Sequence, residues 1–350
     1  MAKVTVAVPA FKIEEKYLRI CLDSILQQTL HDIEVILIVD PVDEVCNRVC
    51  MEYAGKDARI YLMQEKDEGY CVWRNYAIER ASSKWLMYVD GDDYIAPNNC
   101  EVVYEKAEKT QPDFLFWGAT KIYEGTDKQV PYISFHEDIE EFTPELKELL
   151  QMKLLVGDMG FYPAISAKAA TGVIWNKLYN REFLLREKLR LNPEVDRAED
   201  VVFNMNVFEK ADKIIFMNRC FYYYRQHAAS GVHRYHEHGI DVFEGALREF
   251  RDFIVNHNKS EKFMQIYYMR CVFFFLDDMK IDFLHPDNPK SFGTKIREMK
   301  QIVAADPYLE AIQKIDLSLV SGAKKIPFIL LKCHCIRLLY VFFSLYCKTE

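Results

Sequence analysis

Residues 85–93 read Trp-Leu-Met-Tyr-Val-Asp-Gly-Asp-Asp, an apolar run that ends in three carboxylates around a glycine. The apolar part is typical of a buried strand. Carboxylates this close together repel one another, and a divalent cation such as Mg²⁺ or Mn²⁺ relieves the repulsion with oxygen ligands. Gly91 allows a tight turn and the close approach of a ligand. The alternative is an ordinary acidic turn, because Asp-Gly pairs are common at strand ends.

Strand and helix patterns alternate over the first hundred residues. Strands are expected at Val4–Val8, Ile33–Val39, Ile60–Met63 and Trp85–Val89, and helices at Tyr17–Gln28, Asp43–Tyr53 and Tyr70–Ala81. This order predicts an α/β fold with a mostly parallel, Rossmann-like sheet flanked by helices and joined by right-handed crossovers. Ligands bind beyond the carboxyl ends of such strands. Asp40 and the Asp90–Asp93 cluster both follow strand ends, which favours a functional role for them.

The rest of the chain is divided by its patterns. Helices are expected at Cys100–Lys109, Ile174–Lys188 and Glu199–Lys210, strands at Asp113–Lys121 and Ile214–Tyr224, and a loop at Met159–Thr171. Long helical patterns with many aromatic residues follow. We therefore expect a first domain of residues 1–235, a helical region of residues 236–323 and an apolar tail of residues 324–350.

Composition excludes several classes of protein. The net charge of −8 argues against a nucleic-acid binder, because such proteins usually carry a basic patch. The ten cysteines are scattered without a zinc-binding pattern, which is typical of reduced thiols in a cytosolic protein. Met1–Val8 enters a strand pattern without the features of a secretion signal, so a cytoplasmic location is expected.

The tail is apolar but interrupted by charge. Lys332, His334 and Arg337 break the apolar run, which argues against a membrane-spanning helix. Basic residues among Phe, Leu, Ile and Tyr fit a helix that lies in the membrane interface, and peripheral contact at the inner face of the cell membrane is predicted. A buried C-terminal helix or a partner-binding helix is the alternative.

Four motifs in this order resemble the inverting family 2 glycosyltransferases with the GT-A fold, of the bacterial cell-surface polysaccharide type. They are Val6–Phe11, Cys21–Thr29, Arg74-Asn75 and Asp90–Asp93. The resemblance covers roughly residues 4 to 230. It implies a nucleotide-sugar half at about residues 1–97 and an acceptor half at about residues 98–235.

The resemblance implies a donor site for a nucleotide-sugar, with UDP as the expected nucleotide. The residues that match the family's donor site are Pro9, Ala10, Phe11, Asp40, Arg74, Asp90, Gly91 and Asp92. Asp40 matches the aspartate that accepts a hydrogen bond from the base. Two departures weaken the match to uridine: Asp40-Pro41-Val42-Asp43 replaces Asp-Asp-Gly-Ser, and Lys12 replaces an asparagine.

The resemblance also implies a metal cofactor and a general base. Mn²⁺ or Mg²⁺ would be held by Asp92, with His227 as a candidate further ligand, and would neutralise the leaving diphosphate. Asp200 is the expected base that deprotonates the acceptor, with Glu199 as its neighbour or an acceptor-binding group. Trp175 is a candidate for stacking on the acceptor sugar, and an equally acceptable interpretation places it in the core.

The predicted function is therefore transfer of a sugar to a hydroxyl of a glycan or lipid-linked acceptor. A nucleotidyltransferase of nucleotide-sugar synthesis is one alternative, although Val8–Glu15 lacks the glycine-rich phosphate loop of that class. A non-catalytic binding module with the same fold is the other, because a fold does not guarantee an activity. The aromatic helices after residue 236 are compatible with a homo-oligomer.

Overall fold

The computed structural model describes residues 1–66, 68–156, 171–226, 235–320 and 322–346. It divides into two compact units. The first contains most of the described chain up to Gln226, and the second contains residues 155–156, Glu194–Ala198 and the described residues from 235 onward. The three-part division at residues 235 and 323 stays a prediction.

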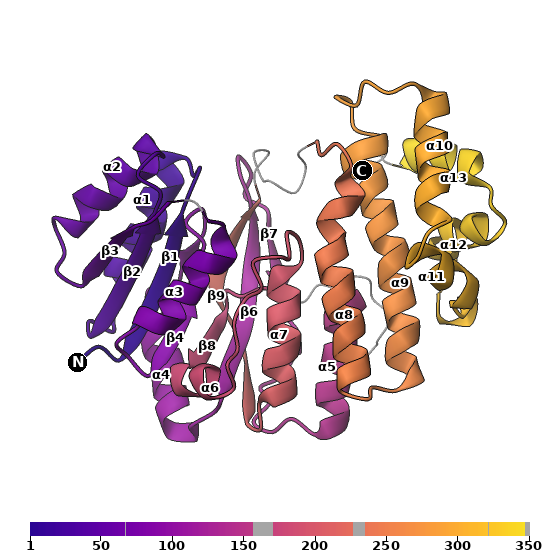
Figure 1. Cartoon of the computed structure of the whole chain (residues 1–350). Helices are drawn as coiled ribbons and strands as arrows, with labels where there is room; N and C mark the ends of the chain where they lie inside the picture. Colours follow the sequence, from indigo (N-terminus) through magenta and orange to yellow (C-terminus); the bar gives the residue numbers. More distant parts are fainter. Residues whose placement is uncertain (67, 157–170, 227–234, 321, 347–350) are drawn as a thin grey trace. The chain divides into compact units, whose positions relative to one another are not determined.

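One mixed sheet organises the first unit. Its nine strands within the described residues are β1 (Val4–Ala10), β2 (Ile33–Val39), β3 (Ile60–Gln64), β4 (Trp85–Tyr88), β5 (Tyr94–Ile95), β6 (Phe114–Tyr123), β7 (Gln129–Tyr132), β8 (Lys177–Asn180) and β9 (Ile214–Gln226). The strand order is β3-β2-β1-β4-β8-β6-β9-β5, with β7 paired to β6 (Figure 1).

Parallel pairing joins the first four long strands. β1 pairs with both β2 and β4, and β2 pairs with β3. Ala10 is in register with Val39, so Phe11 and Asp40 leave the sheet side by side. Antiparallel pairing begins where β8 joins β4. The predicted α/β class is confirmed, and the acidic cluster and Asp40 do follow the carboxyl ends of parallel strands.

Helices cover this sheet. They are α1 (Glu15–Leu26), α2 (Glu44–Ala54), α3 (Tyr70–Arg80), α4 (Asn99–Thr110), α5 (Pro144–Val156), α6 (Arg181–Arg186) and α7 (Glu199–Lys210). The apolar stripe of α1, which includes Leu18, Leu22 and Ile25, is fully buried because residues at this spacing share one helix face.

One predicted helix, Ile174–Lys188, is wrong. The segment forms strand β8 and then the short helix α6. Asn176 has φ of 58°, a left-handed conformation that interrupts a helix and that asparagine tolerates better than most residues. The Asn180 side chain accepts a hydrogen bond from the Glu182 N–H at 3.0 Å and so caps α6, which begins at the next residue. The predicted loop at Met159–Thr171 lies almost entirely outside the described residues.

The second unit is helical. Its helices are α8 (Glu244–Asn256), α9 (Glu261–Asp278), α10 (Phe292–Val303), α11 (Tyr308–Lys314), α12 (Lys325–Lys332) and α13 (Ile336–Tyr346), and a π-helical turn, Met279–Phe283, follows α9. Among the described residues, no helix is both long enough and apolar enough to cross a bilayer.

Candidate active site

The acidic turn after β4 is held in place by β9. Asp93 is 1% exposed and accepts hydrogen bonds from the Tyr222 hydroxyl and the Arg225 N–H, both at 2.7 Å. The same Tyr222 oxygen accepts from the Asp90 N–H at 3.1 Å, and Arg225 Nε donates to the Asp92 carbonyl at 2.9 Å. Asp93 is thus an internal anchor of the turn. Asp90 and Asp92 remain half-buried.

Gly91 lies at the centre of this turn and packs closely against neighbouring side chains. A Cβ at this position would lie 2.5 Å from Ile13 Cδ1 and 3.3 Å from Leu18 Cδ1. A larger residue at this position would therefore require the Ile13 side chain to shift. The close approach of a ligand to Gly91 stays a prediction.

Arg74 joins three carboxylates from two distant parts of the chain. Its Nη1 lies 2.8 Å from Asp200 Oδ1 and 3.5 Å from Glu199 Oε1, and its Nη2 lies 3.0 Å from Asp90 Oδ1. The side chain is only 6% exposed. A guanidinium can hold several carboxylates because its N–H groups form a rigid fork. Arg74 therefore connects the turn after β4 to the start of α7.

Burial raises the pKa of two of these carboxylates. Burial, reinforced by the negative charge of Asp200, raises the pKa of Glu199 to about 7. Burial also raises the pKa of Asp90 to about 6, although Arg74 opposes the shift. The Asp200 carboxylate has a fixed orientation, because Oδ1 accepts from Arg74 and Oδ2 accepts from the Ile174 N–H at 3.1 Å. This geometry suits a positioned proton acceptor.

Two asparagines support this arrangement. Asn75 exchanges two hydrogen bonds with the backbone of Leu191, at 2.8 and 2.9 Å, and so ties α3 to the segment that precedes α7. Asn204 donates to the Asp200 carbonyl at 2.8 Å and accepts from the Tyr179 hydroxyl at 3.0 Å. In the Arg74-Asn75 pair, Arg74 therefore contacts the carboxylates, whereas Asn75 binds the backbone of Leu191.

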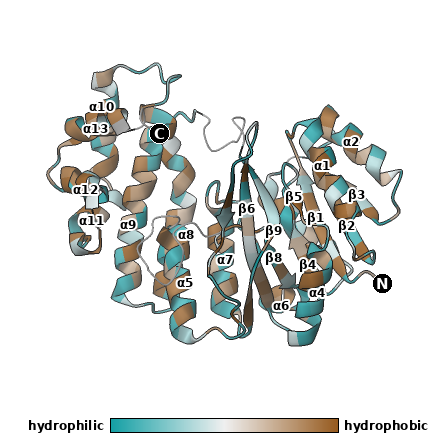
Figure 2. Cartoon of the chain, turned by 180° about the vertical axis from the view of Figure 1, so that it is seen from behind, coloured by the Kyte–Doolittle hydropathy of each residue, from teal (hydrophilic) through white to brown (hydrophobic). Residues whose placement is uncertain are grey.

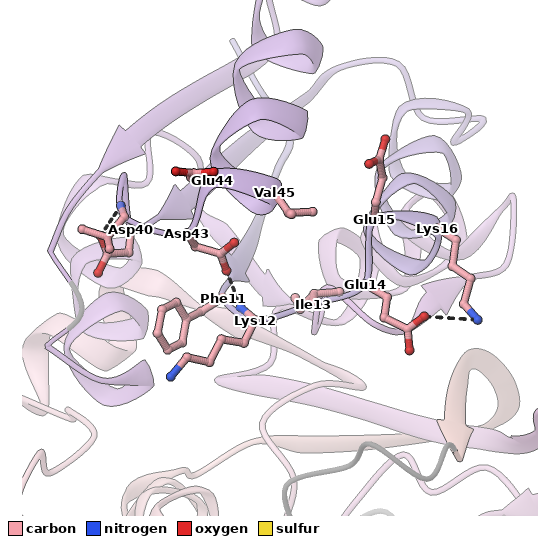
Figure 3. Close-up of a pocket in the computed structure, with 11 residues that line it drawn as sticks. Phe11, Lys12, Ile13, Glu14, Glu15, Lys16, Asp40, Asp43, Glu44 and Val45 are labelled. Atoms are coloured by element: carbon pink, nitrogen blue, oxygen red, sulfur yellow. Dashed lines mark hydrogen bonds and ion pairs between the residues drawn. The ribbon is translucent and has the colours of Figure 1, made fainter.

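A pocket with a volume of about 980 Å³ opens at the carboxyl ends of β1 and β2 (Figure 3). Phe11, Lys12, Asp40 and Asp43 are among its lining residues. Asp40 Oδ1 accepts from the Val42 N–H at 2.8 Å. Lys12 adopts a left-handed conformation, φ 53°, and its ammonium lies 4.5 Å from the centre of the Phe11 ring. Pro9 and Ala10 are buried in β1 and do not line the pocket.

Asp43 fixes the shape of this pocket. Its Oδ2 accepts from the Lys12 N–H at 2.6 Å, and its Oδ1 accepts from the Cys46 N–H at 3.1 Å, which caps α2 (Figure 3). The segment in which Asp40-Pro41-Val42-Asp43 departs from the family pattern therefore still presents two carboxylates. Asp43 was not among the residues predicted for the donor site, although an aspartate directly before a helical pattern is a capping signal.

Tyr70 connects the pocket to the carboxylate site. Its hydroxyl donates to the Phe11 carbonyl at 3.1 Å, and its ring centre lies 5.6 Å from the Arg74 guanidinium carbon. Phe11 also meets Trp73 edge to face, with ring centres 6.0 Å apart. One helix, α3, thus contributes to both parts of the site.

Trp175 and His227 are the remaining predicted site residues. Trp175 is 3% exposed and stacks on Tyr222 with ring centres 4.3 Å apart, so the structure favours the core interpretation over contact with a sugar. His227 lies outside the described residues. Tyr222 and Arg225, which anchor the acidic turn, were not identified from the sequence, because nothing in the aromatic run of β9 distinguishes them from core residues.

Among the residues that the structure describes, no group of three or more His, Cys, Asp or Glu side chains is arranged to hold a metal ion. Magnesium sites in phosphate chemistry, however, often use one or two carboxylates together with substrate phosphates. Burial and the charges of Asp92 and Asp90 raise the pKa of Asp93 well above its usual value. This local excess of negative charge fits a cation at Asp92.

Comparison with known proteins indicates the family of this chain. The model of glycosyl transferase family 2 matches residues 5–170. EpsJ of Bacillus subtilis, an uncharacterized glycosyltransferase, is 28% identical over 232 residues, which is 65% of this chain and 62% of EpsJ. The glycosyltransferase GlyA of Streptococcus pneumoniae is 27% identical over 270 residues, which is 76% of this chain and 36% of GlyA. The chain thus spans about three fifths and one third of the lengths of these relatives.

A solved structure has the same fold. The crystal structure of S. aureus TarS 1-349 in complex with UDP-GlcNAc superimposes with a TM-score of 0.67, covering 99% of this chain and 92% of that one. The two are 18% identical, so the likeness concerns the fold. It extends the comparison beyond the segment that the family model matches.

Proposed function

Because the chain belongs to glycosyl transferase family 2 and has the GT-A fold, we propose that it transfers a sugar from a UDP-sugar to a hydroxyl of a glycan or lipid-linked acceptor. The observation that carries the proposal is the position of Arg74. This one buried side chain contacts Asp90 on the predicted donor side and both Asp200 and Glu199 on the predicted acceptor side.

The bound donor would extend from the pocket at β1 and β2 to the acidic turn after β4. Asp40 and Phe11 line the pocket, and Asp40 offers a carboxylate to the imide N–H of uracil. Tyr70 and Arg74 then lead to Asp90 and Asp92. The TarS structures in complex with UDP and with UDP-GlcNAc support a uridine donor on this fold.

The predicted metal would be held by Asp92. When bound, Mn²⁺ or Mg²⁺ would act as a Lewis acid that neutralises charge on the leaving diphosphate. The protein's own contribution is to keep Asp92 in position, since Asp93 and the Asp92 carbonyl are both fixed to β9. His227 stays a candidate ligand.

Asp200 would act as the general base of an inverting transfer. The acceptor O–H gives its proton to the Asp200 carboxylate, its oxygen forms the new bond to the anomeric carbon, and the sugar–phosphate bond breaks to release UDP. Arg74 and the Ile174 N–H fix the direction of the carboxylate. A positioned base of this kind typically contributes about a hundredfold to ten-thousandfold in rate.

Calorimetric titration with UDP, GDP, CDP and dTDP, with and without Mn²⁺, tests the donor site. We expect metal-dependent binding of UDP that Asp92→Ala abolishes and that Asp212→Ala, a change at an exposed aspartate in the same unit, leaves intact. Binding of a different nucleotide would overturn the assignment of uridine. Binding of none would favour the non-catalytic module.

Release of UDP from a panel of UDP-sugars tests the chemistry. Asp200→Asn should lower the rate on the order of a thousandfold while calorimetry shows UDP still bound. Formation of a nucleotide-sugar from a nucleoside triphosphate and a sugar phosphate would instead support the nucleotidyltransferase alternative.

The setting of the reaction is proposed from the family and the tail. Assembly of a cell-surface polysaccharide at the cytoplasmic face of the membrane would place a lipid-linked acceptor beside the enzyme. Deletion of residues 326–350 should release the protein from the membrane fraction of lysed cells. Unchanged partitioning of the shortened chain would exclude the tail as the cause of membrane contact.

A further inference from the structure

A basic pocket lies between α10 and α13 in the helical unit. It has a volume of about 410 Å³ and is lined by Gly293, Ile296, Arg297, Lys300, Gln301, Ala304 and Arg337. Three of these seven residues are cationic and none is acidic. A pocket of this composition favours an anion, and guanidinium groups in particular match the geometry of a phosphate.

The cations of this pocket are not neutralised by the protein. Among the residues that the structure describes, Arg297, Lys300 and Arg337 form no ion pair and no side-chain hydrogen bond. The sequence near Arg337 explains part of this lack of ion pairs. Residues 317–349 contain no Asp or Glu, but they contain Lys324, Lys325, Lys332, Arg337 and Lys348. The chain as a whole carries a net charge of −8, so the basic region is a local exception.

An exposed apolar stripe begins beside the pocket. Leu338, Val341 and Leu345 on α13 are 60%, 49% and 62% exposed and recur at helical spacing. The opposite face of α13 is buried through Leu339 and Phe343. Figure 2 shows that α12 and α13 are coloured hydrophobic over much of their length. A helix that is apolar on both faces is costly to leave in water, so the outer face needs a partner.

The pocket and the stripe share the first turn of α13, since Arg337 lines the pocket and Leu338 opens the stripe. We infer that this surface binds a bilayer of anionic phospholipid, with the headgroup phosphate in the basic pocket and the stripe among the upper acyl chains. Arg297 and Lys300 on α10 and Arg337 on α13 would contact the phosphate. The inference is independent of the proposed donor site.

Charge decides between a bilayer and a second copy of the chain. In a two-fold symmetric contact the same patch lies on both partners, so the facing pocket would bring three more cations and no acidic lining residue. An anionic lipid surface neutralises them and attracts each basic residue near the surface by about 1 kcal/mol.

Sedimentation of the full chain with lipid vesicles tests the inference. We expect binding to vesicles of phosphatidylcholine with phosphatidylglycerol, little binding to phosphatidylcholine alone, and weaker binding as salt is raised. The combined change Arg297→Glu, Lys300→Glu and Arg337→Glu should weaken binding at least on the order of a hundredfold. Leu338→Ser, Val341→Ser and Leu345→Ser together should also reduce it strongly, even at low salt.

Matched controls keep the result interpretable. Lys109→Glu, Lys188→Glu and Lys210→Glu change the net charge equally at exposed positions of the other unit and should bind vesicles like the wild type. Thermal melting and UDP titration of every variant separate loss of fold, or failure of the donor site, from loss of lipid binding.

Three outcomes would overturn the inference. One is equal binding to neutral and anionic vesicles. Another is stabilisation of the wild type by inorganic phosphate, lost in the Glu variant, without binding to vesicles, which would assign the pocket to a soluble anion. The third is a concentration-dependent dimer that the Ser variant dissociates, again without binding to vesicles, which would assign the stripe to a second copy.

Discussion

Arg74 Nη1 and Asp200 Oδ1 form a 2.8 Å hydrogen bond between residues 126 positions apart in the sequence. The bond links the start of α7 to α3, and the second arm of Arg74 extends the link to Asp90. The whole Arg74 side chain is only 6% exposed. The predicted base and a predicted donor residue are therefore positioned by one side chain.

Replacing Arg74 by lysine should uncouple these two carboxylates. A lysine keeps the charge but lacks the fork, so it cannot hold Asp90 and Asp200 together. We expect the rate of UDP release from a UDP-sugar to fall on the order of a hundredfold, because small displacements of reacting groups have effects of that size. Arg80→Lys, at the exposed end of the same helix, should behave like the wild type. Equal rates for the two variants would contradict the linking role.

Glu199 should make stability depend on pH. Its pKa is raised from an ordinary 4.5 to about 7 by burial and by Asp200. The folded protein therefore holds this proton more tightly than the unfolded chain, and the free energy of unfolding should decrease as pH rises from about 4.5 to about 7 and then level off. Glu199→Gln should remove this part of the slope, as measured by urea denaturation across the range.

The same residue should affect the reaction. If the ionised Glu199 carboxylate accepts a hydrogen bond from the acceptor, UDP release during transfer should rise with pH around a midpoint of about 7. Glu199→Gln should abolish this rise of the rate of UDP release with pH. A profile unchanged by the substitution would restrict Glu199 to a structural role.

Tyr222→Phe should loosen the acidic turn. The change removes one hydroxyl that donates to Asp93 and accepts from the Asp90 N–H, which leaves buried polar groups without partners. We expect a loss of about 1–3 kcal/mol in the free energy of unfolding, with weaker UDP binding by calorimetry. Tyr223→Phe is the matched control, because the Tyr223 ring stacks on Tyr94 and its hydroxyl forms no hydrogen bond among the described residues.

Asp278 should destabilise the helical unit when it ionises. It is 1% exposed, and neither carboxyl oxygen has a hydrogen-bond partner among the described residues. Burial, together with the charges of Asp282 and Asp241 and despite Lys290, raises its pKa from 3.8 to about 8. Gly239 allows this packing, since a Cβ there would lie 2.7 Å from Asp278 Oδ1.

The sign of the Asp278 effect follows from its raised pKa. The folded state retains the proton that the unfolded state loses, so stability should fall as pH rises from 3.8 to about 8 and stay constant above that. In chemical denaturation, the free energy of unfolding of Asp278→Asn should fall less as pH rises. Asp252→Asn, a change at an exposed aspartate, should reproduce the wild-type curve. Parallel curves for all three proteins would disprove the assignment.

Local patterns alone predicted most elements of the first unit. Strand β2 and helix α7 have the bounds that the apolar spacing indicates, because their alternation and helical periodicity are properties of neighbouring residues. The same reasoning predicted a helix over Ile174–Lys188, which is wrong. Its strand exists because β8 fits between β4 and β6, and a pattern within the segment does not contain that information.

The sequence by itself determined the α/β fold and the side of the sheet on which Asp40 and Asp90–Asp93 lie, since right-handed crossovers align the strand ends. Only the tertiary structure decided which groups each candidate side chain contacts. Asp93 is turned to Tyr222 and Arg225, Asp200 is paired with Arg74, and Trp175 is packed on Tyr222. The physical reason is that β9 and α7 are distant in sequence, and burial and charge pairing depend on the elements that the fold brings together.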